Sequence, residues 1–439
     1  MSGQAVYERP VELLQHLIRF DTTNPPGNEA ECVTYIQGLL AEAGLQTTLL
    51  GRVPERQNLI ARLEGRGEAP PLLLYGHADV VTTAGQRWTY PPFEGRIVDG
   101  WVWGRGALDM KSGVAMMVAA LLRAKAEGLE PAGDVVLAVV CDEEAGGDYG
   151  VKYLVESHPE QFSGMRYALG EFGGFTLRVG PACFYPIQVA EKAICWLKAT
   201  VRGPGGHGSM PLRGGAMRRL AGLLQRLEEQ RLPVHVTPVA RQMIDTMAAA
   251  LPFPQGAVLR QLLNPGLCDR VLKLLGERGQ IFEPLVHNTV NATIVRGGEK
   301  VNVIPSEVTV QLDGRLLPGY SPDDMLAELR PVVGPEVELA LIQHDPGPPE
   351  PDMGLFDLLA GVLRRADPDG IPMPLMMTGT TDARFLSRLG IQTYGFTPMQ
   401  LPADLELVRL AHAADERVPV GAVEFGARAI YEVLQTFGV

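Results

Sequence analysis

The stretch Val135-Val-Leu-Ala-Val-Val-Cys-Asp-Glu-Glu144 indicates the class of fold. Its run of consecutive apolar residues, rather than an alternation, is typical of a strand that is buried on both faces of an α/β sheet. Leu72-Leu-Leu-Tyr75 is a second such run, and a helical pattern from Lys111 to Ala126 lies between the two. Buried strands separated by helices predict a central sheet flanked by helices, which is the α/β class.

The pattern of the chain changes near Glu191. Strand-like segments lie at 193–201, 288–295, 307–313 and 337–342, and helical patterns lie at 216–229 and 322–329. The resulting order β-α-β-β-α-β is that of a ferredoxin-like unit, and an extra helical segment at 232–287 interrupts it. We therefore expect a catalytic domain built from 1–190 and 348–439, split by an inserted α+β domain at 191–347.

The composition of the chain indicates which kinds of partner it binds and in which cellular compartment it works. The chain has 439 residues, and 39 Lys and Arg against 51 Asp and Glu give a net charge of −12. An acidic chain lacks the basic footprint of a nucleic-acid or anionic-membrane protein, and no apolar run approaches the roughly 20 residues of a membrane span. The first ten residues lack the apolar core of a secretory signal, and five scattered cysteines suit a reducing compartment. We therefore expect a cytoplasmic protein that binds neither nucleic acid nor membrane.

Each predicted strand of the catalytic domain is followed by residues that bind metals in other proteins. In chain order these are His77, Asp79, Glu143, Glu144 and Glu171, the last of which follows a weaker apolar run at Tyr167-Ala-Leu169. Asp109 precedes the helix that begins at Lys111. In open α/β sheets the binding crevice forms at the carboxyl ends of the strands. Nitrogen and oxygen ligands without sulfur suit Zn²⁺ or a similar divalent ion.

Each of these residues alone also has a plainer explanation. Asp109 fits a helix cap, His77 and Asp79 fit a capping or ion pair, and Glu143-Glu144 fits a solvated charge run. Gly104-x-Gly106-x-x-Asp109 resembles a dinucleotide-binding loop, but its carboxylate lies where a pyrophosphate must bind. Together, several carboxylates at one sheet edge would repel one another, and a metal pair relieves that repulsion.

Longer motifs resemble those of a known family. Tyr75-Gly-His-Ala-Asp79, Gly104-Arg-Gly-Ala-Leu-Asp-Met-Lys-Ser-Gly113 and Asp142-Glu-Glu-Ala-Gly146 are similar to the zinc-dependent aminoacylase, acetylornithine deacetylase, succinyl-diaminopimelate desuccinylase and glutamate carboxypeptidase family. Further matches are Gly203-Pro-Gly-Gly-His-Gly-Ser209, Val301-Asn-Val-Ile-Pro305, Asp313-Gly-Arg315, Gly379-Thr-Thr-Asp382 and His412. The resemblance implies a mixed central sheet of the zinc-exopeptidase type and an inserted ferredoxin-like domain that acts as a lid and in dimerisation.

The resemblance also implies a metal centre. It would hold two Zn²⁺ per chain, with Co²⁺ or Mn²⁺ as substitutes, and Asp109 would bridge them. One ion would also be held by His77 and Glu171, and the other by Glu144 and His412. Glu143 would be the general base, Asp79 would orient His77, and the peptide bond after Asp109 would be cis.

The resemblance gives the inserted domain roles as well. His207, assisted by Asn302, would reach into the site of the neighbouring subunit of a homodimer and stabilise the oxyanion. Arg315 would grip a substrate carboxylate, and Gly379 and Thr380 would donate further hydrogen bonds. Without the resemblance, His207 is better explained as a loop histidine and Arg315 as part of a surface salt bridge.

The leading interpretation is a dinuclear zinc hydrolase that cleaves the amide bond of an N-acyl amino acid or of a small peptide with a free carboxylate. Two alternatives stay open: a dipeptidase or aminopeptidase of the same family, and a catalytically inactive relative that only binds. The second alternative predicts the loss of Glu143 or of a metal ligand. All of these residues are present, which favours an enzyme.

Overall fold

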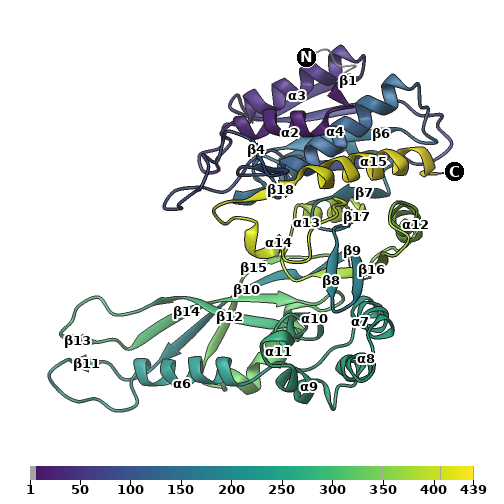
Figure 1. The fold of residues 1–439 in the computed structure, drawn as a ribbon. Helices are drawn as coiled ribbons and strands as arrows, with labels where there is room; N and C mark the ends of the chain where they lie inside the picture. The colour runs from purple at the N-terminus through teal and green to yellow at the C-terminus, as the bar shows by residue number, and fades with distance from the viewer. Residues whose placement is uncertain (1–5, 349, 406, 439) are drawn as a thin grey trace. The chain divides into compact units, whose positions relative to one another are not determined.

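The computed structural model describes residues 6–348, 350–405 and 407–438 (Figure 1). The chain forms two compact units. The first runs to Val189 and continues over Asp352–Leu375 and from Thr381, and the second comprises Ala190–Pro351 and Met376–Thr380. The sequence did not indicate that Met376–Thr380 group with the second unit. Residues 1–5, half of the segment that we interpreted as lacking a secretory signal, lie outside the described residues.

The first unit is built on a nine-stranded sheet in the order β1-β2-β6-β3-β7-β17-β9-β16, with β8 paired to β9. The strands are β1 (Gln46–Val53), β2 (Arg56–Leu63), β3 (Leu72–His77), β6 (Val135–Val140), β7 (Tyr167–Gly170), β8 (Leu177–Val179), β9 (Ala182–Glu191), β16 (Ile371–Met377) and β17 (Gln392–Gly395). Strands β6, β3, β7 and β17 are parallel, whereas β1, β2 and β9 run antiparallel to their neighbours. The sheet is therefore mixed, which confirms the predicted α/β class.

Helices cover both faces of this sheet. They are α2 (Pro10–Arg19), α3 (Ala30–Glu42), α4 (Lys111–Ala126), α5 (Val151–Ser157), α12 (Phe356–Ala366), α13 (Ala383–Leu386), α14 (Leu407–Leu410) and α15 (Val420–Thr436), with 3-10 turns η1 (Glu143–Ala145), η2 (Pro159–Phe162) and η5 (Ser387–Leu389). Helix α4 packs against β3, α2 and α15. Because it is covered on several sides, it is apolar around its circumference. A small sheet of β4 (Arg96–Val98), β5 (Trp101–Trp103) and β18 (Arg417–Pro419) completes the unit.

The alternation of side chains along β3 explains why the strand is apolar throughout. Leu73 and Tyr75 belong to a core cluster that includes Leu154 of α5 and Phe385 of α13. Gly76 points the other way, since a Cβ atom there would lie 2.7 Å from the side chain of Met110 at the start of α4. Both faces of β3 are therefore buried, and burial continues through Val80 beyond its carboxyl end.

The second unit contains a four-stranded antiparallel sheet in the order β12-β14-β10-β15. Its βαββαβ order is β10 (Ala193–Arg202), α6 (Ala216–Glu229), β12 (Thr289–Arg296), β14 (Glu307–Leu316), α11 (Pro322–Val333) and β15 (Glu338–Asp345). The segment between α6 and β12 forms α7 (Pro238–Ala250), α8 (Gln255–Arg260), η3 (Gln261–Leu263), α9 (Cys268–Leu275), η4 (Gly276–Gly279) and α10 (Glu283–Val286). A two-stranded ribbon, β11 (Gly206–His207) and β13 (Val303–Ile304), lies beside α6 in Figure 1.

Apolar side chains of α6 and α11 pack against the sheet of the second unit. Leu220 and Leu223 of α6 and Leu329 of α11 share a cluster with Leu197 and Val310 of the central strands. Among the helices of the described residues, none combines the length and the apolar character that crossing a bilayer requires.

Candidate metal centre

The predicted ligands of the first unit meet at one edge of its sheet. Strands β6, β3 and β7 are neighbours and parallel, so their carboxyl ends lie together. His77 is the last residue of β3, Glu144 lies in η1 just after β6, and Glu171 follows β7 directly. Asp109 reaches the same edge from the turn before α4, and the Asp109–Met110 peptide is cis, as the resemblance implied.

Asp109 lies between two imidazoles and offers one oxygen to each. Its Oδ1 is 3.1 Å from His77 Nε2, and its Oδ2 is 3.1 Å from His412 Nε2. His412 Nε2 is also 3.1 Å from Glu144 Oε1, and His77 Nε2 is 3.4 Å from Glu171 Oε2. The structure thus brings all five predicted ligands together in two groups that share one carboxylate.

The chemistry of this cluster fits divalent cations. The ligand atoms of His77, Asp109 and Glu144 lie within 4.8 Å of one another, as do those of His77, Glu143 and Glu171. Among the described residues, the buried Glu144 Oε1 accepts no well-formed hydrogen bond although His412 lies close to it. Four carboxylates facing two imidazoles leave an excess of negative charge, which cations would neutralise.

Asp79 contacts three of the residues at this sheet edge, His77, Glu143 and Glu144. The carboxylate is fully buried and accepts hydrogen bonds from the main-chain nitrogens of Glu143 and Glu144, both at 3.1 Å. Its Oδ1 lies 3.5 Å from His77 Nδ1, whereas its main-chain carbonyl lies closer, at 3.0 Å from the same nitrogen. Asp79 therefore positions both His77 and the η1 turn, and its carbonyl takes part in orienting the imidazole.

Burial and neighbouring charges shift the pKa values of the cluster. Burial, and then repulsion by Glu171, raise the pKa of Glu143 well above its ordinary range. The Asp109 and Glu144 carboxylates beside its imidazole raise the pKa of His412 to about 10. Although burial opposes ionisation, hydrogen bonds from His412 and His77 keep the pKa of Asp109 below its ordinary value. A carboxylate with a raised pKa among these candidate ligands suits a general base.

Three residues to which sequence analysis assigned no role also belong to this edge: Asn24, Glu416, and Asp382 of the Gly379–Asp382 motif. Asn24 donates to Asp79 at 2.9 Å and to Asp142 at 3.0 Å, and Glu416 accepts from the main-chain nitrogen of Asp109 at 3.1 Å. Asp382 is fully buried, its oxygens have no hydrogen-bond partner within the described ranges, and burial raises its pKa to about 8. The Asn24-Pro25 dipeptide signals a turn, but no local pattern identifies the distant partners of these side chains.

The remaining predicted residues lie in the second unit, in two pairs. The exposed His207 sits in β11, with its Nδ1 2.7 Å from Ser209 Oγ, and Gly208 bonds the carbonyl of Asn302 at 2.8 Å. Arg315 donates through Nε to Asp313 at 2.7 Å, and its Nη1 lies 3.5 Å from Thr380 Oγ1. Gly379 precedes Thr380. The structure therefore places His207 beside Asn302, and Arg315 beside Thr380.

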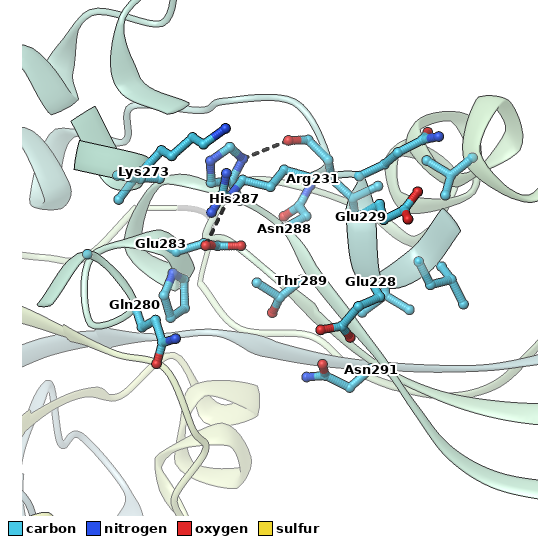
Figure 2. Close-up of a pocket in the computed structure, with 18 of the residues that line it drawn as sticks. Glu228, Glu229, Arg231, Lys273, Gln280, Glu283, His287, Asn288, Thr289 and Asn291 are labelled. Atoms are coloured by element: carbon cyan, nitrogen blue, oxygen red, sulfur yellow. Dashed lines mark hydrogen bonds and ion pairs between the residues drawn. The ribbon is translucent and has the colours of Figure 1, made fainter. Parts of the chain in front are cut away.

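A separate pocket of about 610 Å³ lies within the second unit (Figure 2). It is bordered by α6, α9, α10, α11 and the start of β12, and charged side chains of both signs line it. Arg231 and Glu283 pair there at 2.9 Å, and His287 Nδ1 lies 2.7 Å from the carbonyl of Leu232. None of the predicted site residues is among the described residues that line this pocket, and we assign it no function.

Solved structures share the fold of this chain. An M20 family metallo-carboxypeptidase from Sulfolobus solfataricus covers 98% of this chain and 99% of its own, with a TM-score of 0.69 and 15% identity. The YXEP protein of Bacillus subtilis, described as a dinuclear metal-binding peptidase of the M20 family, covers 98% of both chains, with a TM-score of 0.60 and 13% identity. At these identities the likeness establishes the fold.

Relatives are also found by sequence. A probable carboxypeptidase S-like protein 2 of Dictyostelium discoideum is 30% identical over 378 residues, which are 83% of this chain and 71% of the relative. The human N-fatty-acyl-amino acid synthase/hydrolase PM20D1 is 28% identical over 379 residues, which are 83% of this chain and 74% of that protein.

Carboxylates and imidazoles that converge at the end of a mixed α/β sheet, in a chain with these relatives, define a metal-dependent hydrolase. More particularly, residues 73–436 match the model of peptidase family M20/M25/M40, and the chain belongs to this family. This membership confirms the resemblance that the sequence motifs indicated.

Proposed function

We propose that this hydrolase binds two zinc ions and cleaves the amide bond of an N-acyl amino acid or of a small peptide with a free carboxylate. The observation that carries the proposal is the placement of Asp109, whose two oxygens each lie 3.1 Å from a different imidazole. One carboxylate shared by two ligand groups suits a hydrolase with two metal ions held close together. His77 and Glu171 complete one group, and Glu144 and His412 complete the other.

A bound cation pair supplies Lewis-acid activation of the scissile carbonyl and of a water molecule. In the proposed reaction, the Glu143 carboxylate accepts a proton from the attacking water and returns it to the leaving nitrogen. Its place in η1, with the main-chain nitrogen bonded to Asp79, supports this role because it holds the side chain beside the ligands. Asp79 positions His77 from the buried side.

On the substrate side, we assign the free carboxylate to Arg315. Asp313 engages Nε and Nη2 of the guanidinium at 2.7 and 3.2 Å, so Nη1, near Thr380, is the nitrogen left for an anion. Gly379, Thr380 and Asn302 are the proposed sources of further hydrogen bonds. The two sequence relatives, an N-fatty-acyl-amino acid synthase/hydrolase and a probable carboxypeptidase S-like protein, support a substrate with a carboxylate.

We also propose that the enzyme works as a homodimer in the cytoplasm, with His207 acting in the partner's site. All five cysteines lie in the described part of the chain and are free thiols, which suits a reducing compartment. The edge strand β12 exposes Ile294 and Val295, which are 41% and 51% accessible. Apolar side chains on an open sheet edge favour an interface.

The central test combines metal analysis with a substrate screen. Metal-free protein should take up about two Zn²⁺ per chain and should then hydrolyse N-acyl amino acids faster than their carboxamides, because the amide presents no anion to Arg315. Dipeptides with free and with acylated amino termini belong in the same screen, since preference for a free amino terminus would identify a dipeptidase or aminopeptidase instead.

The matched variants for this test are Asp109→Asn and Asp134→Asn. Asp109→Asn should lose zinc and activity, whereas Asp134→Asn, which loses an ion pair with Arg62 on the same sheet, should keep both. Full activity of the chelated protein would refute the metal mechanism. Stoichiometric zinc without turnover of any amide would favour a binding protein.

A further inference from the structure

His412 occupies a strained and open position for a metal ligand. It lies in a turn between α14 and β18, its φ is 66°, and its side chain is 49% accessible. A residue other than glycine rarely adopts this left-handed conformation. Yet its imidazole sits 3.1 Å from both Asp109 and Glu144, so contacts outside the turn must hold the backbone in place.

Two side chains converge on the main-chain carbonyl of His412. Gln86 donates to it through Nε2 at 2.8 Å, and Arg105 donates to it through Nη2 at 3.1 Å. The same Arg105 nitrogen donates to Gln86 Oε1 at 2.8 Å. The carbonyl, the amide and the guanidinium thus form a closed triangle of hydrogen bonds, which fixes the direction of the carbonyl and with it the turn.

The triangle is anchored on the Asp109 side as well. Arg105 is fully buried, and its Nη1 forms an ion pair with Glu416. The other oxygen of Glu416 accepts from the main-chain nitrogens of Leu108 and Asp109, at 2.7 and 3.1 Å. The buried Arg105–Glu416 pair therefore bonds to the main chain at both Asp109 and His412 and fixes the positions of both residues.

We infer that Gln86, together with Arg105, is a positioning residue that holds His412 against Asp109 and thereby sets the affinity of one cation site. The inference rests on the proposed dinuclear site. The hydrogen bonds of Gln86 reach the His412 carbonyl, Arg105 and Trp88, and none of those that the structure gives reaches His77 or Glu171. Loss of Gln86 should therefore weaken the Glu144–His412 site and spare the His77–Glu171 site.

The test uses the full chain and calorimetric titration of the metal-free protein with Zn²⁺. In Gln86→Ala, one of the two binding steps should weaken by about 10- to 100-fold, the usual effect of removing a partner of a ligand. The other step and the melting temperature of the metal-free protein should stay unchanged. Gln86→Glu keeps an acceptor for Arg105 but cannot donate to the carbonyl, and it should show the same selective loss.

Gln15→Ala is the matched control. Gln15 also donates its amide to a carbonyl of this region, that of Gly95, at 2.6 Å, and its loss should leave both zinc steps intact. Equal weakening of both steps, an unchanged titration of both Gln86 variants, or the same effect in Gln15→Ala would overturn the inference. Absence of zinc binding by the wild type would instead overturn the proposed function, and the inference with it.

Discussion

Glu143 and Glu144 are neighbours in sequence with different proposed roles, general base and metal ligand. Substituting each by Gln distinguishes the two roles. Glu143→Gln keeps the shape of the side chain but cannot accept a proton, so turnover should fall by about 10²- to 10⁴-fold while zinc content is retained. Glu144→Gln should lose part of the zinc. Kinetics and elemental analysis of both variants check this. Because Glu143 also lies within ligand distance of His77 and Glu171, loss of one zinc in Glu143→Gln would make it a ligand instead.

Arg315 should matter only for substrates with an anion. Arg315→Ala should lower kcat/KM for an N-acyl amino acid by the equivalent of about 1.5–3 kcal/mol, which a charge-assisted hydrogen bond contributes, and should affect the carboxamide far less. Arg202→Ala is the control, since Arg202 forms exposed ion pairs with Glu307 and Glu338 on the same sheet. Equal losses on both substrates would make Arg315 structural.

Single residues were predictable from the sequence where their signal was local. His77 and Glu171 stand directly after apolar strands; each alone was ambiguous, and only their grouping with the other acids and the family motifs suggested ligands. Asn24 and Gln86 carry no such signal, because their partners Asp79 and His412 lie 55 and 326 positions away. The left-handed conformation of His412 also depends on those distant hydrogen bonds.

Among the elements, β3, β6 and α4 were predicted because burial on several sides makes them continuously apolar. Strand β1 was not, since it lies at the sheet edge and none of its residues is fully buried. Strand β9 was also missed. Its residues Ala182–Glu191 extend from the first unit into the second, and the change of pattern near Glu191 drew attention to β10 alone.

The junction of β9 and β10 contains a fully buried lysine. Lys192 donates to the carbonyls of Pro284 and His287 at 3.2 and 2.7 Å and to Thr289 Oγ1 at 3.0 Å. Burial, and then repulsion by Arg315, lower the pKa of Lys192 to about 7, although Glu283 opposes the shift. This strand junction is therefore linked to the inserted helical segment through a group that titrates near neutrality.

The lowered pKa predicts a pH-dependent stability. Below about pH 7 Lys192 is charged in both states, and burying the charge costs stability. Between about 7 and 10.5 the unfolded chain holds a proton that the folded chain lacks, so stability should rise by up to about 1.4 kcal/mol per pH unit. Lys192→Met should abolish that rise in melting experiments, and the exposed Lys198→Met should keep it. Parallel curves for all three proteins would contradict the prediction.

At the scale of the whole molecule, the dimer proposal predicts complementation. Glu143→Gln and His207→Ala should each be inactive alone, for different reasons. If His207 serves the partner's site, a mixed dimer has one site with both groups intact, so random mixing should restore about a quarter of the sites. Activity of the mixture and its molar mass by light scattering check this. No recovery in verified mixed dimers, or a fully active monomer, would refute the trans role.

The α/β fold class was predictable because buried strands alternate with a helix over 72–140. The βαββαβ order of the inserted segment was visible over 193–342. The grouping of Met376–Thr380 with the second unit was not predictable, because its contacts, such as that of Met377 with Lys192, join residues far apart in sequence and leave no periodic pattern in a short segment. Family membership, by contrast, followed from several motifs in a fixed order, which no single motif could establish.

The split of the ligands along the chain has a consequence for biosynthesis. His77, Asp109, Glu144 and Glu171 leave the ribosome before the inserted domain is translated, whereas His412 follows it. A chain translated only as far as residue 190 contains His77 but not His412. Only the group of His77, Asp109 and Glu171 then has all of its residues. Strands β16 and β17 of the same sheet also follow the inserted domain, so the sheet and the Glu144–His412 group are completed only in the last part of synthesis.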